Sequence, residues 1–179
     1  MVIHTVGHSN RSAEALLALL DAFAVEVLID VRAVPRSRRH PQFERGALAA
    51  ALAAAGREYR WWGAALGGMR RARSDSPHRA LPADGLRGYA DHMASPTFRG
   101  ALHDVLELAA TRRVALMCAE ADFRHCHRQL IADSLVLAGA EVRHIRAPDQ
   151  AASHEFHPAL CAARNPPVYN AGLSGDLFD

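Results

Sequence analysis

The sequence predicts an α/β fold in a single domain: an open, mainly parallel sheet of about five strands with helices on both faces, as in a Rossmann-like three-layer sandwich. Apolar runs of strand length alternate with segments of helical periodicity along the chain. This β-α-β order joins parallel strands through helical crossovers. Residues 26–34, EVLIDVRAV, are largely apolar, which is typical of a central strand covered on both faces. At 179 residues the chain is long enough for one domain with a substantial core.

The first half of the chain contains three of the predicted strands. Residues 2–9 alternate up to a glycine and indicate the first strand. Ser12 is a candidate N-cap for an amphipathic helix over 13–24, in which leucines recur at helical spacing. After the second strand, an alanine-rich helix over 46–55 precedes a third strand over 57–62.

The second half begins with a segment, 64–84, that shows no periodicity and is dominated by glycine, proline and arginine. A loop of this length inside a compact domain is usually either functional or disordered. Regular patterns then return in five segments: helices over 84–93, 97–111 and 123–139, and strands over 113–120 and 141–147.

These elements place the α/β domain in residues 1–147. Residues 148–179 are predicted to form an irregular extension that packs on the domain or forms a tail, with a turn of helix around 154–163. The sequence indicates no internal repeat and no second domain.

Charge and cysteine content bound the class of protein. The formal net charge is only +2, which argues against a general nucleic-acid-coating role. The three cysteines, Cys118, Cys126 and Cys161, fit no simple disulfide framework and indicate a reduced protein. The sequence shows neither a signal-peptide pattern nor an apolar run of membrane-spanning length. We therefore predict a cytoplasmic protein without a membrane partner.

All 21 basic residues are arginine, and two clusters of them lie in predicted loops. These are residues 35–40, PRSRRH, and residues 67–74, GGMRRARS. Solvated loop surface is the ordinary interpretation of such clusters. Because the planar guanidinium group suits phosphate and carboxylate, the functional interpretation is capture of a phosphate-bearing ligand.

Polar side chains follow three of the predicted strands. In an open parallel sheet, ligands bind at the carboxyl ends of the strands, so these side chains are expected to share one edge. They are His8, Ser9, Asn10 and Arg11 after the first strand, Asp30, Arg32 and Arg36 at and after the second, and Cys118 and Glu120 after the fourth.

The segment 116–133, LMCAEADFRHCHRQLIAD, spans the end of the fourth strand and the start of the next helix. Asp122 is a candidate cap for a helix beginning near Phe123, whose free N–H groups would attract an anion and lower the pKa of a nearby thiol. Cys126, however, shares an apolar stripe with later residues of the helix, and Cys118 lies in an apolar strand. Taken singly, each cysteine is better explained by core packing than by catalysis.

A cysteine-dependent phosphatase or rhodanese-like enzyme is one alternative. Cys118 and Arg124 enclose five residues, which is the spacing of tyrosine phosphatases, and residues 28–32, LIDVR, look like a stretch of rhodanese-like domains. The five enclosed residues, AEADF, include no glycine and two acids, which would resist a tight phosphate cradle. This alternative is therefore the weaker one.

A zinc site is a second alternative. Cys118, Cys126 and His127, or His154, His157 and Cys161, supply suitable ligand types. Neither set has CxxC or HExxH spacing, so the signal for zinc is weak, and no other cofactor is indicated.

Four ordered motifs, TVGHSNRS, LIDVRAVPRSRRHPQF, LGG and LMCAEADFRHCHRQLIAD, resemble the domain-of-unknown-function 488 family of bacteria and archaea. The resemblance extends from His4 to about Ile145, and the activity of that family is unsettled. Family members often have a proline where this chain has Phe123, and Arg124 is not a family feature, which weakens the phosphatase analogy. The residues that the resemblance implies are Gly7, His8, Ser9, Asp30, Arg32, Pro35, Arg36, Cys118, Glu120, Cys126, His127 and Arg128.

Proteins that resemble this chain often end in a glutamine-containing, leucine-phenylalanine motif similar to sliding-clamp ligands. This chain ends GLSGDLFD, which keeps Leu177 and Phe178 but lacks the glutamine. The resemblance therefore implies a sliding clamp as a partner, while packing of the segment on its own domain explains it equally well.

The leading hypothesis is an enzyme that binds an anionic, phosphate-bearing substrate, with a nucleotide or nucleic acid favoured, and that is a hydrolase or transferase. The acid-base candidates are His8, Asp30, Glu120 and His127. The anion-binding candidates are Ser9, Asn10, Arg32, Arg36 and Arg128. Cys118 and Cys126 are candidates for nucleophile, metal ligand or packing. The rival hypothesis is a non-catalytic adaptor that binds nucleic acid or protein through the basic loops and the C-terminal tail.

Overall fold

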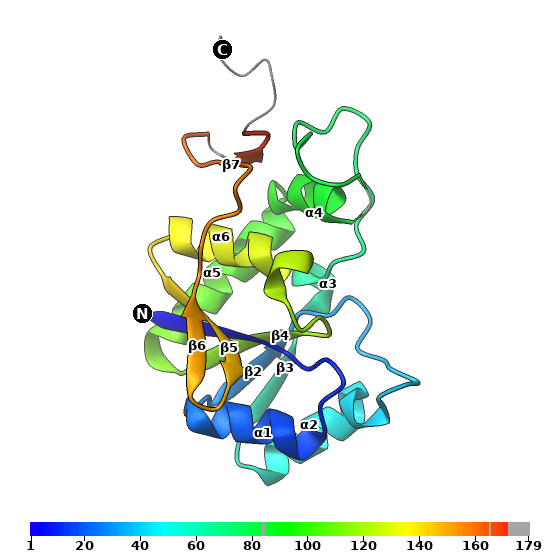
Figure 1. Cartoon of the computed structure of the whole chain (residues 1–179), viewed down its shortest axis with the longest axis vertical. Coiled ribbons are helices and arrows are strands. Elements are labelled where there is room, and N and C mark those ends of the chain that lie inside the picture. Colours follow the sequence, from blue (N-terminus) through cyan, green and yellow to red (C-terminus); the bar gives the residue numbers. More distant parts are fainter. Residues whose placement is uncertain (84, 165, 172–179) are drawn as a thin grey trace.

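The computed structural model describes residues 1–83, 85–164 and 166–171. It contains a six-stranded sheet in the order β3-β2-β4-β1-β5-β6 and a separate two-stranded sheet of β7 and β8. Strands β1 to β5 run parallel, and β6 is antiparallel to β5. Helices cover both faces of the large sheet (Figure 1), which confirms the predicted α/β three-layer fold.

Strands and helices occupy the following residues. The strands are β1 Val2–Gly7, β2 Val27–Asp30, β3 Glu58–Trp61, β4 Val114–Cys118, β5 Glu141–Ala147, β6 Gln150–Ser153, β7 Leu160–Cys161 and β8 Val168–Tyr169. The helices are α1 Ala13–Ala22, α2 Arg45–Ala54, α3 Gly63–Leu66, α4 Leu86–Met93, α5 Pro96–Thr111 and α6 Arg128–Leu137, with 3₁₀ helices at Pro41–Phe43 and Phe123–His125. Across the part of the chain that the structure describes, no helix has both the length and the apolar character needed to cross a bilayer.

The two faces of the sheet carry separate hydrophobic cores. Successive side chains of a strand point to opposite faces, and β2 shows this directly. Val27 and Ile29 pack with residues of α4, α5 and α6, whereas Leu28 packs with residues of α1 and α2. Both β2 and β4 are buried along their whole length, which explains why the sequence shows them as nearly continuous apolar runs.

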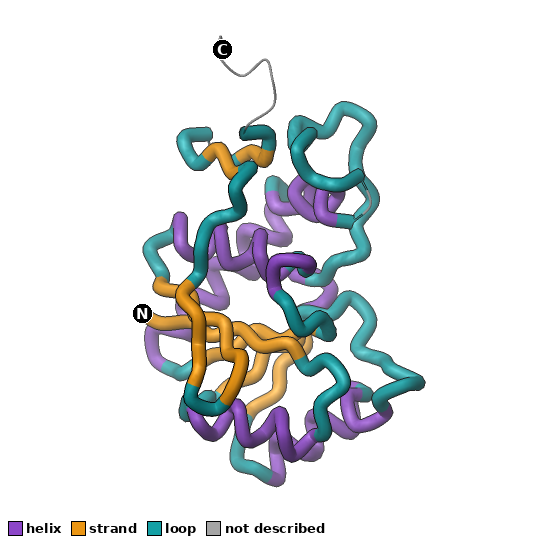
Figure 2. The backbone as a smooth tube through the Cα atoms, viewed as in Figure 1, coloured by secondary structure: helices purple, strands orange, loops and turns teal. Residues whose placement is uncertain are grey.

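The chain leaves the sheet toward opposite faces after β1 and β4, which are neighbours in the sheet. Strand β1 leads into α1 on one face, and β4 leads into α6 on the other. Adjacent parallel strands whose connections diverge in this way leave a crevice at their carboxyl ends. Gly7 lies opposite Cys118 in the register of the sheet, so the crevice opens between them. Figure 2 shows the loops after β1, β2 and β4, in teal, at this edge of the sheet.

The structure corrects the helix expected over 123–139. Asp122 caps only a 3₁₀ turn, because its side chain accepts the backbone N–H of Arg124 at 3.0 Å. Cys126 is then extended, with φ of −136° and ψ of 152°, and α6 begins at Arg128. The Cys126 sulfur accepts the backbone N–H of Arg128 at 3.5 Å, as a capping side chain does. The two cysteines therefore lie on the strand end and on the turn that follows it, and neither lies on the helix.

The residues after 147 form strands where a turn of helix was expected. Strand β6 pairs with β5 and adds a sixth strand to the sheet, and β7 pairs with β8. The helical turn predicted around 154–163 is therefore wrong, because β7 lies in this stretch and is held by β8. Leu177 and Phe178, the expected clamp-like pair, lie outside the described residues.

The close approach of β1 to the loop after β4 depends on Gly7. A Cβ atom at this position would lie 2.0 Å from the carbonyl oxygen of Glu120. Because overpacking of this kind costs about 1–3 kcal/mol, we expect Gly7→Ala to lower the free energy of unfolding by about 3 kcal/mol. Gly100→Ala in α5, where a Cβ meets open space, is expected to raise it by about 1 kcal/mol. Urea unfolding measures both, and equal effects of the two changes would contradict the assignment.

Candidate functional site

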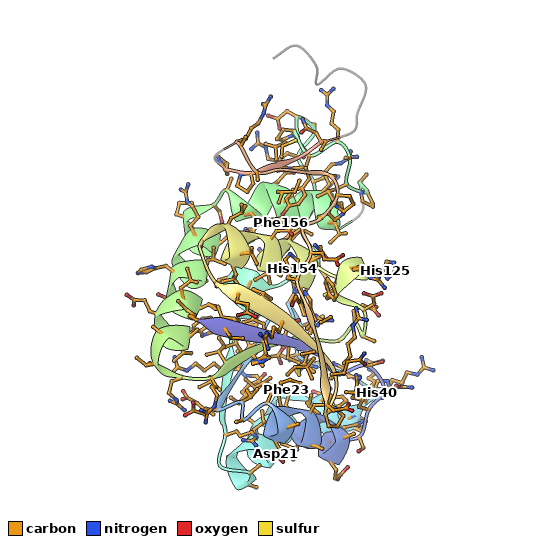
Figure 3. The ribbon with its side chains drawn as sticks, turned by 60° about the vertical axis from the view of Figure 1, so that its left-hand side comes forward. Asp21, Phe23, His40, His125, His154 and Phe156 are labelled. Carbon is orange, nitrogen blue, oxygen red and sulfur yellow. The ribbon has the colours of Figure 1, made fainter. Side chains whose placement is uncertain are left out.

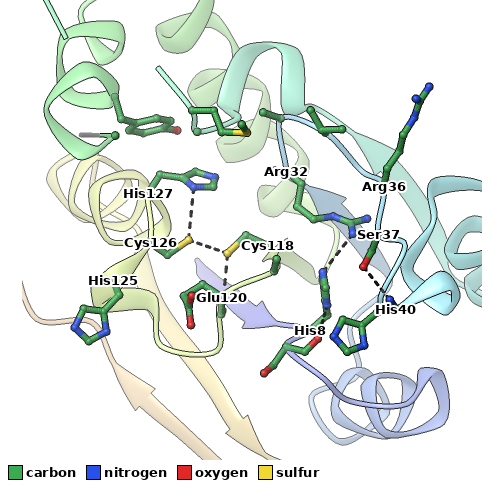
Figure 4. Close-up of a pocket in the computed structure, with 18 of the residues that line it drawn as sticks. His8, Arg32, Arg36, Ser37, His40, Cys118, Glu120, His125, Cys126 and His127 are labelled. Carbon is green, nitrogen blue, oxygen red and sulfur yellow. Dashed lines mark hydrogen bonds between the residues drawn. The ribbon is translucent and has the colours of Figure 1, made fainter. Parts of the chain in front are cut away.

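The crevice between β1 and β4 opens into a pocket of about 940 Å³, which is within the size range of small-molecule sites. The loops after β1, β2 and β4 form most of its walls (Figure 4). The segments around Met69 and Leu86 complete the lining. The pocket is lined by His8, Ser9, Asn10, Arg32, Ala33, Val34, Arg36, Ser37, Arg39, His40, Gly68, Met69, Gly85, Leu86, Tyr89, Cys118, Ala119, Glu120, His125, Cys126 and His127.

A buried carboxylate holds Arg32 in the wall of the pocket. Asp30 is fully buried, and its two oxygens accept hydrogen bonds from Nε of Arg32 at 2.9 Å and from Nη2 at 2.5 Å. The hydroxyl of Tyr59 donates to the same carboxylate at 2.7 Å. This bidentate pairing fixes the plane of the guanidinium group. Asp30 therefore positions Arg32 and does not itself reach the pocket.

His8 joins this cluster as a neutral imidazole. Its Nδ1 donates to the carbonyl of Ser9 at 2.9 Å, so Nε2 is free to accept from Nη1 of Arg32 at 3.3 Å. Burial lowers the pKa of His8 to about 4, and the charge of Arg32 also acts in this direction. At neutral pH both ring nitrogens are thus engaged. This arrangement suits a residue that positions Arg32 more than one that exchanges protons.

Two arginines of the pocket remain available to a ligand. Arg36 and Arg39 are exposed, and neither forms an ion pair with a carboxylate of residues 1–83, 85–164 or 166–171. Glu120 is the one carboxylate among the described residues that line the pocket, and its Oε1 accepts the backbone N–H of Ala121. The balance of charge on this surface is therefore positive, which favours an anionic ligand.

Two cysteines and a histidine face the basic residues across the pocket (Figure 4). The Sγ atoms of Cys118 and Cys126 are 2.7 Å apart. His127 donates from Nε2 to the carbonyl of Val31 at 3.0 Å, which leaves Nδ1 as an acceptor, 3.5 Å from Sγ of Cys126. A thiol beside an imidazole that can accept its proton is an arrangement that activates a nucleophile.

Arg128 lies behind the two thiols, with 1% of its surface exposed. Its Nε donates to Sγ of Cys118 at 3.0 Å, and its Nη1 donates to Oγ1 of Thr5 at 3.2 Å. Its Nη2 donates to the carbonyl oxygens of Glu120 and Ala121. Among the described residues no carboxylate forms an ion pair with it. Arg128 thus acts on the thiols and on the loop after β4 instead of lining the pocket.

The two thiols ionise as a pair. A hydrogen bond from Cys118 lowers the pKa of Cys126 to about 7, and the nearby charge of Arg128 contributes to this decrease. Burial raises the pKa of Cys118 well above its ordinary value, and the hydrogen bond and negative charge of Cys126 raise it further. Near neutral pH the pair therefore carries a single negative charge that Arg128 compensates.

A chain of buried hydrogen bonds extends from Arg128 through β1 and β5 to Asp133, which lies further along the same helix α6. Oγ1 of Thr5, which accepts from Arg128, donates to Nδ1 of His144 at 2.7 Å. His144 donates from Nε2 to Nδ1 of His154 at 3.0 Å, and His154 (Figure 3) donates from Nε2 to Asp133 at 2.7 Å. Burial lowers the pKa of His144 to about 3, so its ring is neutral. The chain therefore links Arg128 to the carboxyl group of Asp133 through Thr5, His144 and His154.

The pocket brings together nine of the residues predicted from the sequence. Two others lie outside it: Asp30 lies beneath Arg32, and Arg128 lies behind the thiols. The described lining also contains residues that sequence reasoning did not single out, such as Met69, Leu86 and Tyr89. No local signal in the sequence marks these three residues. Met69 lies in the long segment between β3 and α4, and the path of that segment brings Leu86 and Tyr89 on α4 to the pocket. The nine residues are His8, Ser9, Asn10, Arg32, Arg36, Cys118, Glu120, Cys126 and His127.

The loop after β4 does not form a phosphatase-like cradle. The guanidinium group of Arg124 pairs with Asp122 through Nε and Nη2, and both residues lie at the surface of the turn. The carboxylates of Glu120 and Asp122 accept the backbone N–H groups of Ala121 and Arg124. These N–H groups are therefore occupied by the acids of the loop itself. In the described part of the chain, no group of three or more histidine, cysteine or acidic side chains is arranged to hold a metal ion.

Fold and site together define an α/β protein with a basic, thiol-containing pocket at the carboxyl edge of its parallel strands. The family model "Domain of unknown function DUF488" matches residues 12–135, which is more than half of the chain, and the chain belongs to this family. No curated protein and no solved structure matches the chain.

The ion pair of Arg32 and Asp30 provides one test of the site. Asp30→Asn keeps the shape of the side chain but leaves the buried guanidinium group without a counter-charge. Loss of one partner of such a pair costs about 3–5 kcal/mol, so we expect a decrease of about 3 kcal/mol in the free energy of unfolding. The exposed pair of Arg73 and Asp75 supplies the control, since Asp75→Asn is expected to leave the free energy of unfolding nearly unchanged. Urea unfolding that shows similar costs for both would contradict the role of Asp30.

The pKa of Cys126 provides a second test. In a Cys161→Ser background, the rate of alkylation by iodoacetamide is expected to rise with pH to a midpoint near 7, because only the thiolate reacts and the pKa of Cys126 is about 7. Cys118→Ala removes the hydrogen-bond donor and is expected to move the midpoint upward. A midpoint at or above about 8.5, the value of an ordinary thiol, in both proteins would disprove the proposed pairing.

Proposed function

We propose that the protein is an enzyme that binds an anionic, phosphate-bearing substrate in the pocket at the carboxyl ends of β1, β2 and β4, with a nucleotide favoured. In this proposal Arg36 and Arg39 capture the phosphate, Arg32 orients it, and the thiolate of Cys126 faces it as the nucleophile. A reducing, cytoplasmic setting is part of the proposal, since all three cysteines are free thiols.

The observation that carries the proposal is the difference between the three arginines. Arg32 is neutralised by Asp30 and held in one orientation. Arg36 and Arg39 are exposed on the same loop and have no described counter-ion. A fixed guanidinium group next to two adjustable ones suits a ligand whose charged group is first attracted and then oriented.

Two further observations favour a nucleotide over a long nucleic acid. The volume of about 940 Å³ is sufficient for a small ligand. Met69 and Leu86 offer an apolar surface on the part of the wall that comes from outside the β-strand loops. A base packed against this surface would place its phosphate toward the arginines. The net charge of +2 also gives little support for a role in coating nucleic acid.

Isothermal titration with adenosine 5′-monophosphate and with adenosine tests the proposal. We expect the phosphate to contribute to affinity, and Arg36→Ala/Arg39→Ala to weaken binding of the monophosphate at least tenfold, since each hydrogen bond between charged groups contributes about 1.5–3 kcal/mol. Arg38→Ala is the matched control, because Arg38 is exposed on the same loop but does not line the pocket. Its affinity is expected to stay within about twofold.

Two outcomes contradict the proposal. Equal affinities of the wild-type protein for adenosine and its monophosphate would exclude phosphate recognition. Equal losses in the double variant and in Arg38→Ala would show that the arginines act only through the general charge of the loop.

A further inference from the structure

The two thiols of the pocket are close enough to form a covalent bond with little movement. Their Sγ atoms are 2.7 Å apart, and a disulfide bond is about 2.05 Å long. The sulfurs therefore need to approach by less than about 1 Å. Both sulfurs belong to residues that line the pocket (Figure 4), and Cys126, which is 6% exposed, is the more accessible of the two.

The backbone around Cys126 permits this approach. Cys126 lies in extended conformation between the 3₁₀ helix Phe123–His125 and the start of α6. Cys126 thus belongs to neither helix, whereas Cys118 lies at the end of the central strand β4. The pair therefore combines one sulfur on a strand of the sheet with one sulfur on a turn.

The charge of Arg128 gives the pair a chemical role beyond packing. A guanidinium group that is 1% exposed and has no carboxylate ion pair in the described structure needs a compensating negative charge. The sulfur of Cys118 accepts from its Nε at 3.0 Å, and a second thiol lies against that sulfur. Two ordinary core thiols would leave this buried cation uncompensated. A shared thiolate compensates it and is at the same time the reactive form in thiol–disulfide exchange.

We propose that Cys118 and Cys126 form a reversible dithiol–disulfide pair, and that the protein exchanges disulfides with low-molecular-weight disulfides that carry anionic groups. The disulfide exchange itself does not depend on the proposed binding of a phosphate. Only the preference for anionic reactants rests on the proposed function, because it uses the same Arg36 and Arg39.

The exchange proceeds in two balanced steps. The thiolate of Cys126 attacks one sulfur of the reactant RSSR, so that a Cys126–S–SR bond forms and RS⁻ leaves. The thiol of Cys118 gives its proton to that RS⁻, and the new thiolate is stabilised by Nε of Arg128. It then attacks the sulfur of Cys126, forms the Cys118–Cys126 disulfide and releases the second RS⁻, which takes a proton from water. In total the two protein thiols are oxidised and RSSR is reduced to two RSH; excess RSH reverses the reaction.

Equilibration of the full-length protein in glutathione buffers of increasing oxidised fraction tests the pair. After acid quenching and thiol alkylation, we expect mass spectrometry to show two fewer alkyl labels on the oxidised protein. The protein itself is expected to be lighter by about 2 Da, because disulfide formation removes two hydrogen atoms, and the peptides that contain Cys118 and Cys126 are expected to be joined. Cys161, whose Sγ donates to Asn170 at 3.1 Å, is the control cysteine and is expected to remain labelled. Cys161→Ser is expected to form the disulfide normally, whereas Cys118→Ser and Cys126→Ser are expected to lose it.

Dithiothreitol is expected to reduce the Cys118–Cys126 disulfide and to restore labelling of both cysteines, which completes the test. Continued labelling of Cys118 and Cys126 at the most oxidising ratio, or a mixed disulfide on Cys126 that Cys118 never resolves, would overturn the proposal. Because wild-type protein is used for the titration, this result does not depend on whether any variant folds.

Rates of oxidation by two probes separate this proposal from the proposed function. Oxidised glutathione carries carboxylates, and bis(2-hydroxyethyl) disulfide is neutral. We expect the ratio of the two second-order rate constants to fall at least tenfold in Arg36→Ala/Arg39→Ala and to be unchanged in Arg38→Ala. Disulfide formation with an unchanged ratio in all three proteins would support the dithiol pair and overturn its anion preference. Binding of the nucleotide without disulfide formation would overturn the dithiol pair alone.

Discussion

The buried guanidinium group of Arg128 is the interaction on which the rest of the site depends. Its three nitrogens donate to a sulfur on β4, to a hydroxyl on β1 and to two carbonyls of the loop after β4. These bonds hold together the two strands between which the crevice opens. Because the cation is sealed from solvent, it also demands a negative charge nearby, and the thiols of Cys118 and Cys126 are the groups that can supply one.

The parallel sheet made much of this site predictable. The carboxyl ends of parallel strands share an edge, so the polar residues after β1, β2 and β4 had to lie close together, and His8, Arg32 and Cys118 do so. The fold was predictable for a related reason: strands buried on both faces, such as β2 and β4, show apolar runs in the sequence. Both results follow from topology alone.

Depth and spacing within the site were not predictable from the sequence. Arg128 was expected to bind an anion at the start of a helix, but the helix begins later than its pattern indicates, and Arg128 turns inward beneath the loop. Asp30 likewise lies under Arg32, which a strand-end rule cannot distinguish from a position beside it. The 2.7 Å approach of the two sulfurs depends on the turn between Asp122 and Cys126, and turn geometry leaves little trace in residue pattern.

The chain of donors from Arg128 through Thr5, His144 and His154 to Asp133 has a consequence for the minimum length of the protein. Tyr169, near the end of the described residues, donates its hydroxyl to the second oxygen of Asp133 at 2.9 Å. Among the described residues, a chain shortened to end at residue 147 would keep the sheet core but would lose His154 and Tyr169. Thr5 would then be the remaining side-chain hydrogen-bond partner of His144, and Gln129 that of Asp133. The described residues after 147, which lie beyond the predicted α/β domain, therefore complete a polar interior that is hydrogen-bonded through Thr5 to Arg128.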